Sequence, residues 1–139
     1  MNFVVDSSFA LAWVLQDETT PETDQALDSL GQGAKAFTPA LWRWEVANAL
    51  LMVEQRKRAT ITEINSHLAL LRSLPIELDE TAHDQAWTAT FSLARKHKLT
   101  SYDASYLELA LRRVLPLATL DAELAVAAKL ENVALLPAK

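Results

Sequence analysis

The sequence contains no cysteine and very little glycine. Without cysteine, the chain can form no disulfide framework, no Cys-ligated zinc or iron–sulfur site and no thiol nucleophile. Average proteins contain about 7% glycine, so roughly ten glycines would be expected in a chain of this length. Only Gly31 and Gly33 are present. This excludes a Walker phosphate-binding loop and a dinucleotide-binding fingerprint, because both need several glycines at fixed spacing.

Positive charge and long apolar runs are also scarce. The 13 Lys and Arg residues are outnumbered by 18 Asp and Glu residues, which gives a formal net charge of −5 at pH 7. This balance argues against a protein that holds nucleic acid by bulk charge. The first apolar stretch, from Phe3 to Leu15, is interrupted by Asp6 and two serines and is too short to span a bilayer. We therefore expect a soluble, cytoplasmic protein with no membrane partner.

The 139 residues are 50% hydrophobic, which is enough for the core of one domain over residues 1–139. Short apolar runs that suit buried strands alternate with helical patterns, as in a parallel sheet covered by helices on both faces. The expected strands are 3–5, 36–39, 76–78, 117–120 and 133–136. The expected helices are 9–15, 21–30, 40–58, 62–73 with Thr62 as its cap, one from Asp79 or Thr81 to His97, 102–114 and 122–130. The fold class is therefore α/β.

Four acidic residues occupy positions where an α/β sheet places function. Asp6 directly follows the strand 3–5, and Asp121 directly follows the strand 117–120. Glu45 lies in an apolar helical pattern on the side that it shares with Asn48, and Asp103 opens the helix 102–114. Because sites in such sheets lie outside the carboxyl ends of the strands, these acids can meet at one edge. The three Asp residues can alternatively be simple helix caps, and the Glu a solvated side chain.

A cluster of carboxylates predicts a particular chemistry. Carboxylates that lie close together repel one another, so they must bind protons or a cation. Oxygen ligands without Cys or His suit Mg²⁺, with Mn²⁺ able to substitute, rather than zinc. Such an ion can orient a water nucleophile and stabilise the leaving oxygen of a phosphodiester. The three histidines, His67, His83 and His97, lie far apart in the sequence and are expected to be exposed helix residues.

Four sequence blocks carry a resemblance to a known family. They are Val4-Val5-Asp6-Ser7-Ser8 with Trp13 downstream, Trp44-Glu45-Val46-Ala47-Asn48-Ala49-Leu50, Tyr102-Asp103-Ala104-Ser105-Tyr106-Leu107-Glu108-Leu109-Ala110, and Thr119-Leu120-Asp121. In this order, and spread over nearly the whole chain, they resemble the PIN-domain ribonucleases. Within that family they are similar to the VapC-type toxins of type II toxin–antitoxin pairs.

The resemblance implies a three-layer α/β/α sandwich whose five-stranded parallel sheet has the order 3-2-1-4-5. The family's catalytic and metal-binding acids are matched by Asp6, Glu45, Asp103 and Asp121. Ser8 and Thr119 match hydroxyl positions that support the first and last acids by hydrogen bonds. Asn48 matches a polar position one turn after the glutamate, where it would orient that side chain.

The resemblance also implies partners. It predicts a Mg²⁺-dependent endoribonuclease that cleaves single-stranded or looped RNA, forms a homodimer and is silenced by a cognate antitoxin in its active-site groove. Arg43, between two tryptophans, is a candidate for contacting substrate phosphate or the antitoxin. Assigning four of the 18 acids to a metal site leaves 14 against 13 basic residues. An RNA substrate is therefore compatible with the acidic composition once a cation is bound.

Other interpretations stay open. A solitary PIN nuclease would match the same residues, and so would a catalytically idle module that only binds a partner. A phosphorylated signalling domain with Asp6 as the acceptor is a third, although the sequence lacks a second acid beside Asp6 and a late lysine at a strand end. The basic clusters, including Arg112-Arg113, are explained by helix dipoles. The four tryptophans are expected in the core or, with Phe9 and Leu41, at a partner surface.

Overall fold

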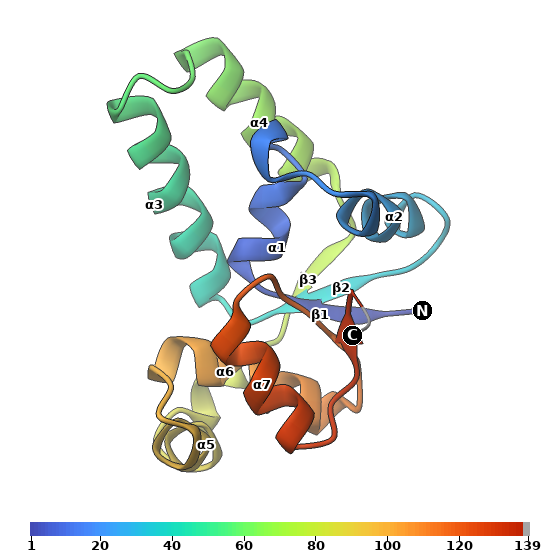
Figure 1. Ribbon diagram of the computed structural model, residues 1–139, viewed down its shortest axis with the longest axis vertical. Coiled ribbons are helices and arrows are strands. Elements are labelled where there is room, and N and C mark those ends of the chain that lie inside the picture. Colours follow the sequence, from blue (N-terminus) through green and yellow to red (C-terminus); the bar gives the residue numbers. More distant parts are fainter. Residues whose placement is uncertain (138–139) are drawn as a thin grey trace.

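The computed structural model describes residues 1–137 and contains one parallel sheet of five short strands (Figure 1). The strands are β1 (Phe3–Val5), β2 (Ala36–Thr38), β3 (Ile76–Leu78), β4 (Leu117–Ala118) and β5 (Leu135–Leu136). Every pair of neighbours is parallel, and the order is β3-β2-β1-β4-β5, which confirms the predicted topology. The central strands β2, β1 and β4 are buried along their whole length because helices cover both faces of the sheet.

Seven α-helices and two 3₁₀ turns lie in the described chain. They are α1 (Ser7–Ala12), η1 (Gln16–Glu18), α2 (Pro21–Leu30), α3 (Leu41–Gln55), α4 (Ile61–Ser73), η2 (Ala82–Gln85), α5 (Ala89–His97), α6 (Ser101–Arg113) and α7 (Ala122–Leu130). Figure 1 shows α1 to α4 on one side of the sheet and α5 to α7 on the other, so the molecule has the three predicted layers. Within residues 1–137, each helix is too short or too polar to cross a membrane.

Hydrogen-bonded caps set the helix starts. Thr20 caps α2, with Pro21 at the first helical position. The predicted cap of α4, Thr62, is wrong. Thr60 is the cap instead, because its hydroxyl accepts from the backbone N–H of Glu63 while the Glu63 carboxylate accepts from the backbone N–H of Thr60. This reciprocal capping box satisfies two backbone N–H groups at the start of the helix.

The prediction of one helix from Asp79 or Thr81 to His97 is also wrong. The segment forms η2 and then α5, and the backbone at Thr88, just before α5, is not helical. Asp79 is 4% exposed and caps no helix. Its carboxylate instead accepts hydrogen bonds from Arg112, at 3.0 and 3.1 Å, and from Arg113 Nε at 2.7 Å. This contact ties the chain after β3 to the end of α6.

The ion pair of Asp79 gives both arginines specific partners. Burial alone would raise the pKa of Asp79, but the hydrogen bonds from Arg112 and Arg113 outweigh burial and hold that pKa well below its usual range. Arg112 also pairs with Glu108 at 2.8 Å, and the Arg113 guanidinium lies 4.2 Å from the ring centroid of Phe37. Interaction with the helix dipole is therefore not the main role of these two residues.

Replacing Asp79 with asparagine is expected to lower the free energy of unfolding by about 2–3 kcal/mol. Breaking a buried pair costs about 3–5 kcal/mol, and we discount this because the Arg side chains are partly exposed. The folded-state pKa of Asp79 is depressed, so its contribution is present above pH ~4 and is lost as the pH falls. Urea unfolding at pH 7 and pH 3 measures both effects. Asp84→Asn, whose side chain is 63% exposed, is the control and should change little.

The tryptophans divide into two groups. Trp13 and Trp42 are each 6% exposed and belong to the core, as predicted. Trp44 and Trp87 are 75% and 93% exposed, so they lie outside it. Phe9 is completely buried and stacks edge-on against Trp13, so the prediction that it contributes to a partner surface is wrong.

The prediction that the histidines are exposed fails at His97. Its side chain is only 6% exposed, and Nε2 lies 2.6 Å from Oε2 of Glu131. Lys96 contacts the same carboxylate oxygen at 2.7 Å. This three-residue contact joins the end of α5 to the turn after α7. The partner is 34 residues away in the sequence, so the helical position of His97 gives no sign of it.

Candidate active site

Asp6 is the most buried of the four predicted acids and is 4% exposed. It caps α1, because Oδ1 accepts from the backbone N–H of Phe9 at 2.9 Å. The same oxygen accepts from Ser8 Oγ at 2.7 Å, while Oδ2 accepts from Thr119 Oγ1 at 2.5 Å. Capping and site formation are therefore not alternatives at Asp6, since one carboxylate does both.

The environment of Asp6 disfavours its charge. Burial raises its pKa from 3.8 to about 6, although the hydrogen bonds from Thr119, Phe9 and Ser8 oppose the shift. The negative charge of Asp103 raises that pKa further. A carboxyl group that is buried beside another carboxylate can keep its charge at neutral pH if a cation compensates it.

Asp121 stands at the neighbouring strand end. Its carboxylate caps α7 by accepting from the backbone N–H of Leu124 at 2.9 Å. Its own N–H donates to Thr119 Oγ1 at 3.0 Å, and that hydroxyl donates to Asp6. Ser8 Oγ similarly accepts from the backbone N–H of Leu120 at 3.0 Å while it donates to Asp6. The two hydroxyls thus cross-link the carboxyl ends of β1 and β4.

Asp103 is the electrostatic neighbour of the other three acids. Burial raises its pKa, and the negative charges of Asp121 and Glu45 raise it further. Its charge in turn raises the pKa of Asp6. Asp103 does not cap its helix, because the N-cap of α6 is Thr100, whose hydroxyl accepts from the backbone N–H of Asp103. The fold therefore brings Asp103 within electrostatic reach of each of the other three predicted acids.

Tyr106 and Glu123 belong to this environment and escaped the sequence analysis. The buried Tyr106 hydroxyl donates to Glu45 Oε1 at 2.5 Å and joins α6 to α3. Burial and this hydrogen bond hold the pKa of Tyr106 far above its usual range, so the phenol stays a neutral donor. Glu123, in the first turn of α7, adds to the negative charge felt by Asp103. Helical spacing could have identified Tyr106 from the sequence, since it follows Asp103 by one helical turn.

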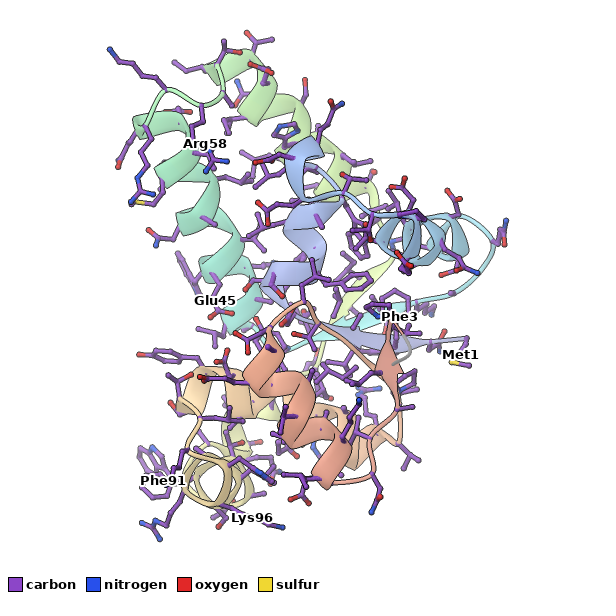
Figure 2. All side chains as sticks on the ribbon, in the orientation of Figure 1. Met1, Phe3, Glu45, Arg58, Phe91 and Lys96 are labelled. Carbon is purple, nitrogen blue, oxygen red and sulfur yellow. The ribbon has the colours of Figure 1, made fainter. Side chains whose placement is uncertain are left out.

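Two other predicted site residues, Asn48 and Arg43, are exposed on α3. Within residues 1–137 the side chain of Asn48 forms no hydrogen bond, so its orienting role stays a prediction. Arg43 is exposed and stands about 160° around α3 from Glu45, given two residues at 100° each. Figure 2 shows Glu45 at the end of α3 nearest the sheet. Arg43 instead lines a groove against α4 and β3, and its contact with substrate stays a prediction.

The donor set fits a hydrated Mg²⁺ ion better than a fully protein-ligated metal. In the described part of the chain, no three Asp, Glu or His side chains are arranged to hold a metal directly. Mg²⁺ keeps several waters and is usually bound through one or two carboxylates, so it does not require such a group. The oxygen-only side chains and the raised pKa values of Asp6 and Asp103 both match a site for a hard cation.

Comparisons with known proteins agree with this fold. The PIN domain matches residues 3–130 of the chain. Ribonuclease VapC3 of Pyrobaculum aerophilum is 31% identical over 125 residues, which cover 90% of this chain and 93% of the relative.

Two solved structures share the fold. PAE2754 from Pyrobaculum aerophilum superposes with a TM-score of 0.67 and 24% identity, covering 91% of this chain and 79% of that one. VapBC2 from Rickettsia felis, bound to a DNA fragment from its promoter, has a TM-score of 0.67 and 12% identity, with 97% of each chain covered. The PIN domain matches most of the chain, the VapC3 relative is aligned over 90% of it, and the sheet has the expected strand order. The chain therefore belongs to the PIN-domain family.

Proposed function

We propose that this single-domain protein is a Mg²⁺-dependent endoribonuclease in which Mn²⁺ can replace Mg²⁺. The observation that carries the proposal is the convergence of four carboxylates, Asp6, Glu45, Asp103 and Asp121, with Asp103 interacting with the other three. Asp6 and Asp121 follow β1 and β4, Glu45 lies in the N-terminal half of α3, and Asp103 lies in the first turn of α6. The relationship to Ribonuclease VapC3 supports RNA as the substrate.

The side chains have separable tasks. A bound Mg²⁺ would supply an oriented water and compensate the charge of the phosphate. Asp6 accepts three hydrogen bonds, and a carboxylate has about four acceptor positions, so one lone pair stays available for the ion. Tyr106 fixes one oxygen of Glu45 and leaves the other for the ion or its waters. Ser8 and Thr119 hold Asp6 in one orientation.

A cleavage assay with defined substrates tests the proposal. Purified protein, free of other nucleases, is incubated with end-labelled single-stranded RNA, hairpin RNA, duplex RNA and DNA of the same sequence. Internal cuts in the single-stranded or looped RNA are expected with Mg²⁺ or Mn²⁺, and none are expected after EDTA treatment. Cleavage that persists in EDTA, or that requires DNA, would contradict the assignment. No cleavage of any RNA with either metal would favour the idle binding module.

The protein is also proposed to act as the toxin of a toxin–antitoxin pair whose antitoxin covers the acidic edge. The shared fold with VapBC2 supports such a partner. If a short neighbouring gene encodes a protein that binds this chain and stops its RNA cleavage, the toxin assignment holds. If the gene's neighbours encode no such inhibitor, the chain is a solitary nuclease.

A homodimer completes the proposed assembly. Trp44, Leu51 and Met52 are exposed on one face of α3, and an exposed apolar patch of this kind favours self-association. Trp44→Glu is expected to convert the dimer to a monomer in sedimentation-velocity experiments. Leu130→Glu, at a similarly exposed position on α7, is the matched control and should stay dimeric. A wild-type protein that sediments as a monomer at micromolar concentration would contradict the dimer.

A further inference from the structure

We propose that a groove between α3, α4 and β3 is a second binding site, which takes a short apolar and acidic segment of a partner protein. The groove has a volume of about 500 Å³, within the ~300–1,000 Å³ range of ligand pockets. Its apolar wall includes Trp42 and Val46 from α3 and Leu71 from α4. Leu78, on the edge strand β3, closes one side.

The groove is separate from the acidic cluster. None of its lining residues is one of the four acids, and Arg43 faces it from the side of α3 that lies about 160° from Glu45. Two of the acids follow the central strands β1 and β4, and the other two lie in α3 and α6, whereas the groove lies at the outer strand β3. An occupant of the groove therefore leaves the proposed RNA site open.

Charge indicates an acidic occupant. The charged side chains that line the groove are two arginines, Arg43 and Arg72, in a chain with a net charge of −5. Both are exposed, and neither forms a salt bridge within residues 1–137. Other arginines of the chain, such as Arg58 and Arg112, are paired with carboxylates. Guanidinium groups bind carboxylates in a bidentate geometry, so this pair favours Asp or Glu side chains in the occupant.

A buried donor indicates that the occupant also brings an oxygen acceptor. Trp42 is 6% exposed, and its indole Nε1–H has no hydrogen-bond partner within the described residues. The comparable indole of Trp13 donates to the backbone oxygen of Thr23 at 2.9 Å. A buried N–H that lacks an acceptor is destabilising, and Trp42 lines the groove, so an occupant that brings an oxygen to this nitrogen would be favoured. A purely apolar ligand offers no such oxygen.

A second copy of the chain is a less suitable occupant. The exposed apolar face proposed for self-association contains Trp44 and Leu51, which do not line the groove and lie about 100° and 80° around α3 from Arg43. The self-association face and the groove therefore use different residues of α3. The occupant is accordingly a segment of a different protein, with leucine-like side chains for the wall and carboxylates for Arg43 and Arg72.

A pair of synthetic peptides tests the proposal. The probe is acetyl-Glu-Leu-Leu-Glu-Leu-Glu-amide, and its control replaces each Glu by Lys. Binding is followed through the indole N–H signals in ¹⁵N–¹H NMR spectra and by titration. We expect the acidic peptide to bind with a Kd below about 1 mM and to shift the Trp42 signal more than the Trp13 signal. No binding at 1 mM, or equal binding of the basic peptide, overturns the proposal.

Variants test the arginine contacts and the Trp42 contact of the groove separately. The double variant Arg43→Glu/Arg72→Glu is expected to weaken binding at least tenfold, whereas Arg56→Glu, at the far end of α3, should bind normally. Trp42→Phe should also weaken binding without lowering stability through a lost hydrogen bond, because the indole N–H makes none. If the double variant instead abolishes self-association in sedimentation experiments, a second copy occupies the groove and the proposal is wrong. Failure of peptide binding leaves the RNA-cleavage assay unaffected, so the two proposals can fail independently.

Discussion

Asp6→Asn and Asp103→Asn are each expected to lower Mg²⁺-dependent RNA cleavage by more than about 1,000-fold. Residues that only support a metal ligand typically cost 10–100-fold when they are removed, and a direct ligand should cost more. Asparagine has the shape of aspartate but no charge, so the variant removes attraction for the cation while the fold is kept. At Asp6, the Asn carbonyl can still accept from the N–H of Phe9 and cap α1.

The comparison requires controls for folding and for general acidity. Asp28→Asn neutralises an exposed acid on α2, away from the site, and should cleave at the wild-type rate. Thr119→Val should fall between the two, with a loss of about 10–100-fold, because it removes the hydrogen bonds that Thr119 makes to Asp6 and to the Asp121 N–H but leaves the four carboxylates in place. Circular dichroism and thermal melts show that each variant is folded. Wild-type cleavage by both Asp6→Asn and Asp103→Asn would place the active site elsewhere.

The four acids were predictable because local rules place them. Asp6 and Asp121 follow buried strands, and parallel strands end at a common edge, so their proximity follows once the order of β1 and β4 is known. That order came from the resemblance and not from periodicity, because strands of two or three residues carry little register information. The caps and the metal-site candidates coincide at Asp6 and Asp121, which explains why either interpretation fitted the sequence.

The residues that sequence analysis misplaced are those with distant partners. Tyr106 bonds to Glu45 across 61 positions, Asp79 to Arg112 across 33, and His97 to Glu131 across 34. Helical periodicity describes which face a residue occupies but not what the next layer offers it. Trp44 illustrates the converse, because its apolar character predicts burial while its position in the first turn of α3 leaves it 75% exposed.

Asp6→Asn, which is expected to stop cleavage, is also expected to stabilise the metal-free protein at pH 8. The folded-state pKa of Asp6 is about 6, above its ordinary value of 3.8, so the folded state binds more protons between these values. The free energy of unfolding therefore falls as the pH rises from ~4 to ~6 and stays lower above that range. The shift of about two pKa units corresponds to about 3 kcal/mol, which Asp6→Asn would relieve.

The net gain is smaller because the Thr119 hydroxyl loses its charged acceptor. We expect about 1–2 kcal/mol at pH 8, or a rise of about 3–6 °C in Tm for a chain of this size, and no gain at pH 4. Mg²⁺ should raise the Tm of the wild type and not that of the variant, because binding to the folded state stabilises it. Calorimetry of the wild type and of Asp6→Asn, each in EDTA and in Mg²⁺, measures the four Tm values. A variant that melts below the wild type at pH 8 in EDTA would mean that the Asp6 carboxylate is stabilised by its hydroxyl partners alone, without needing a cation.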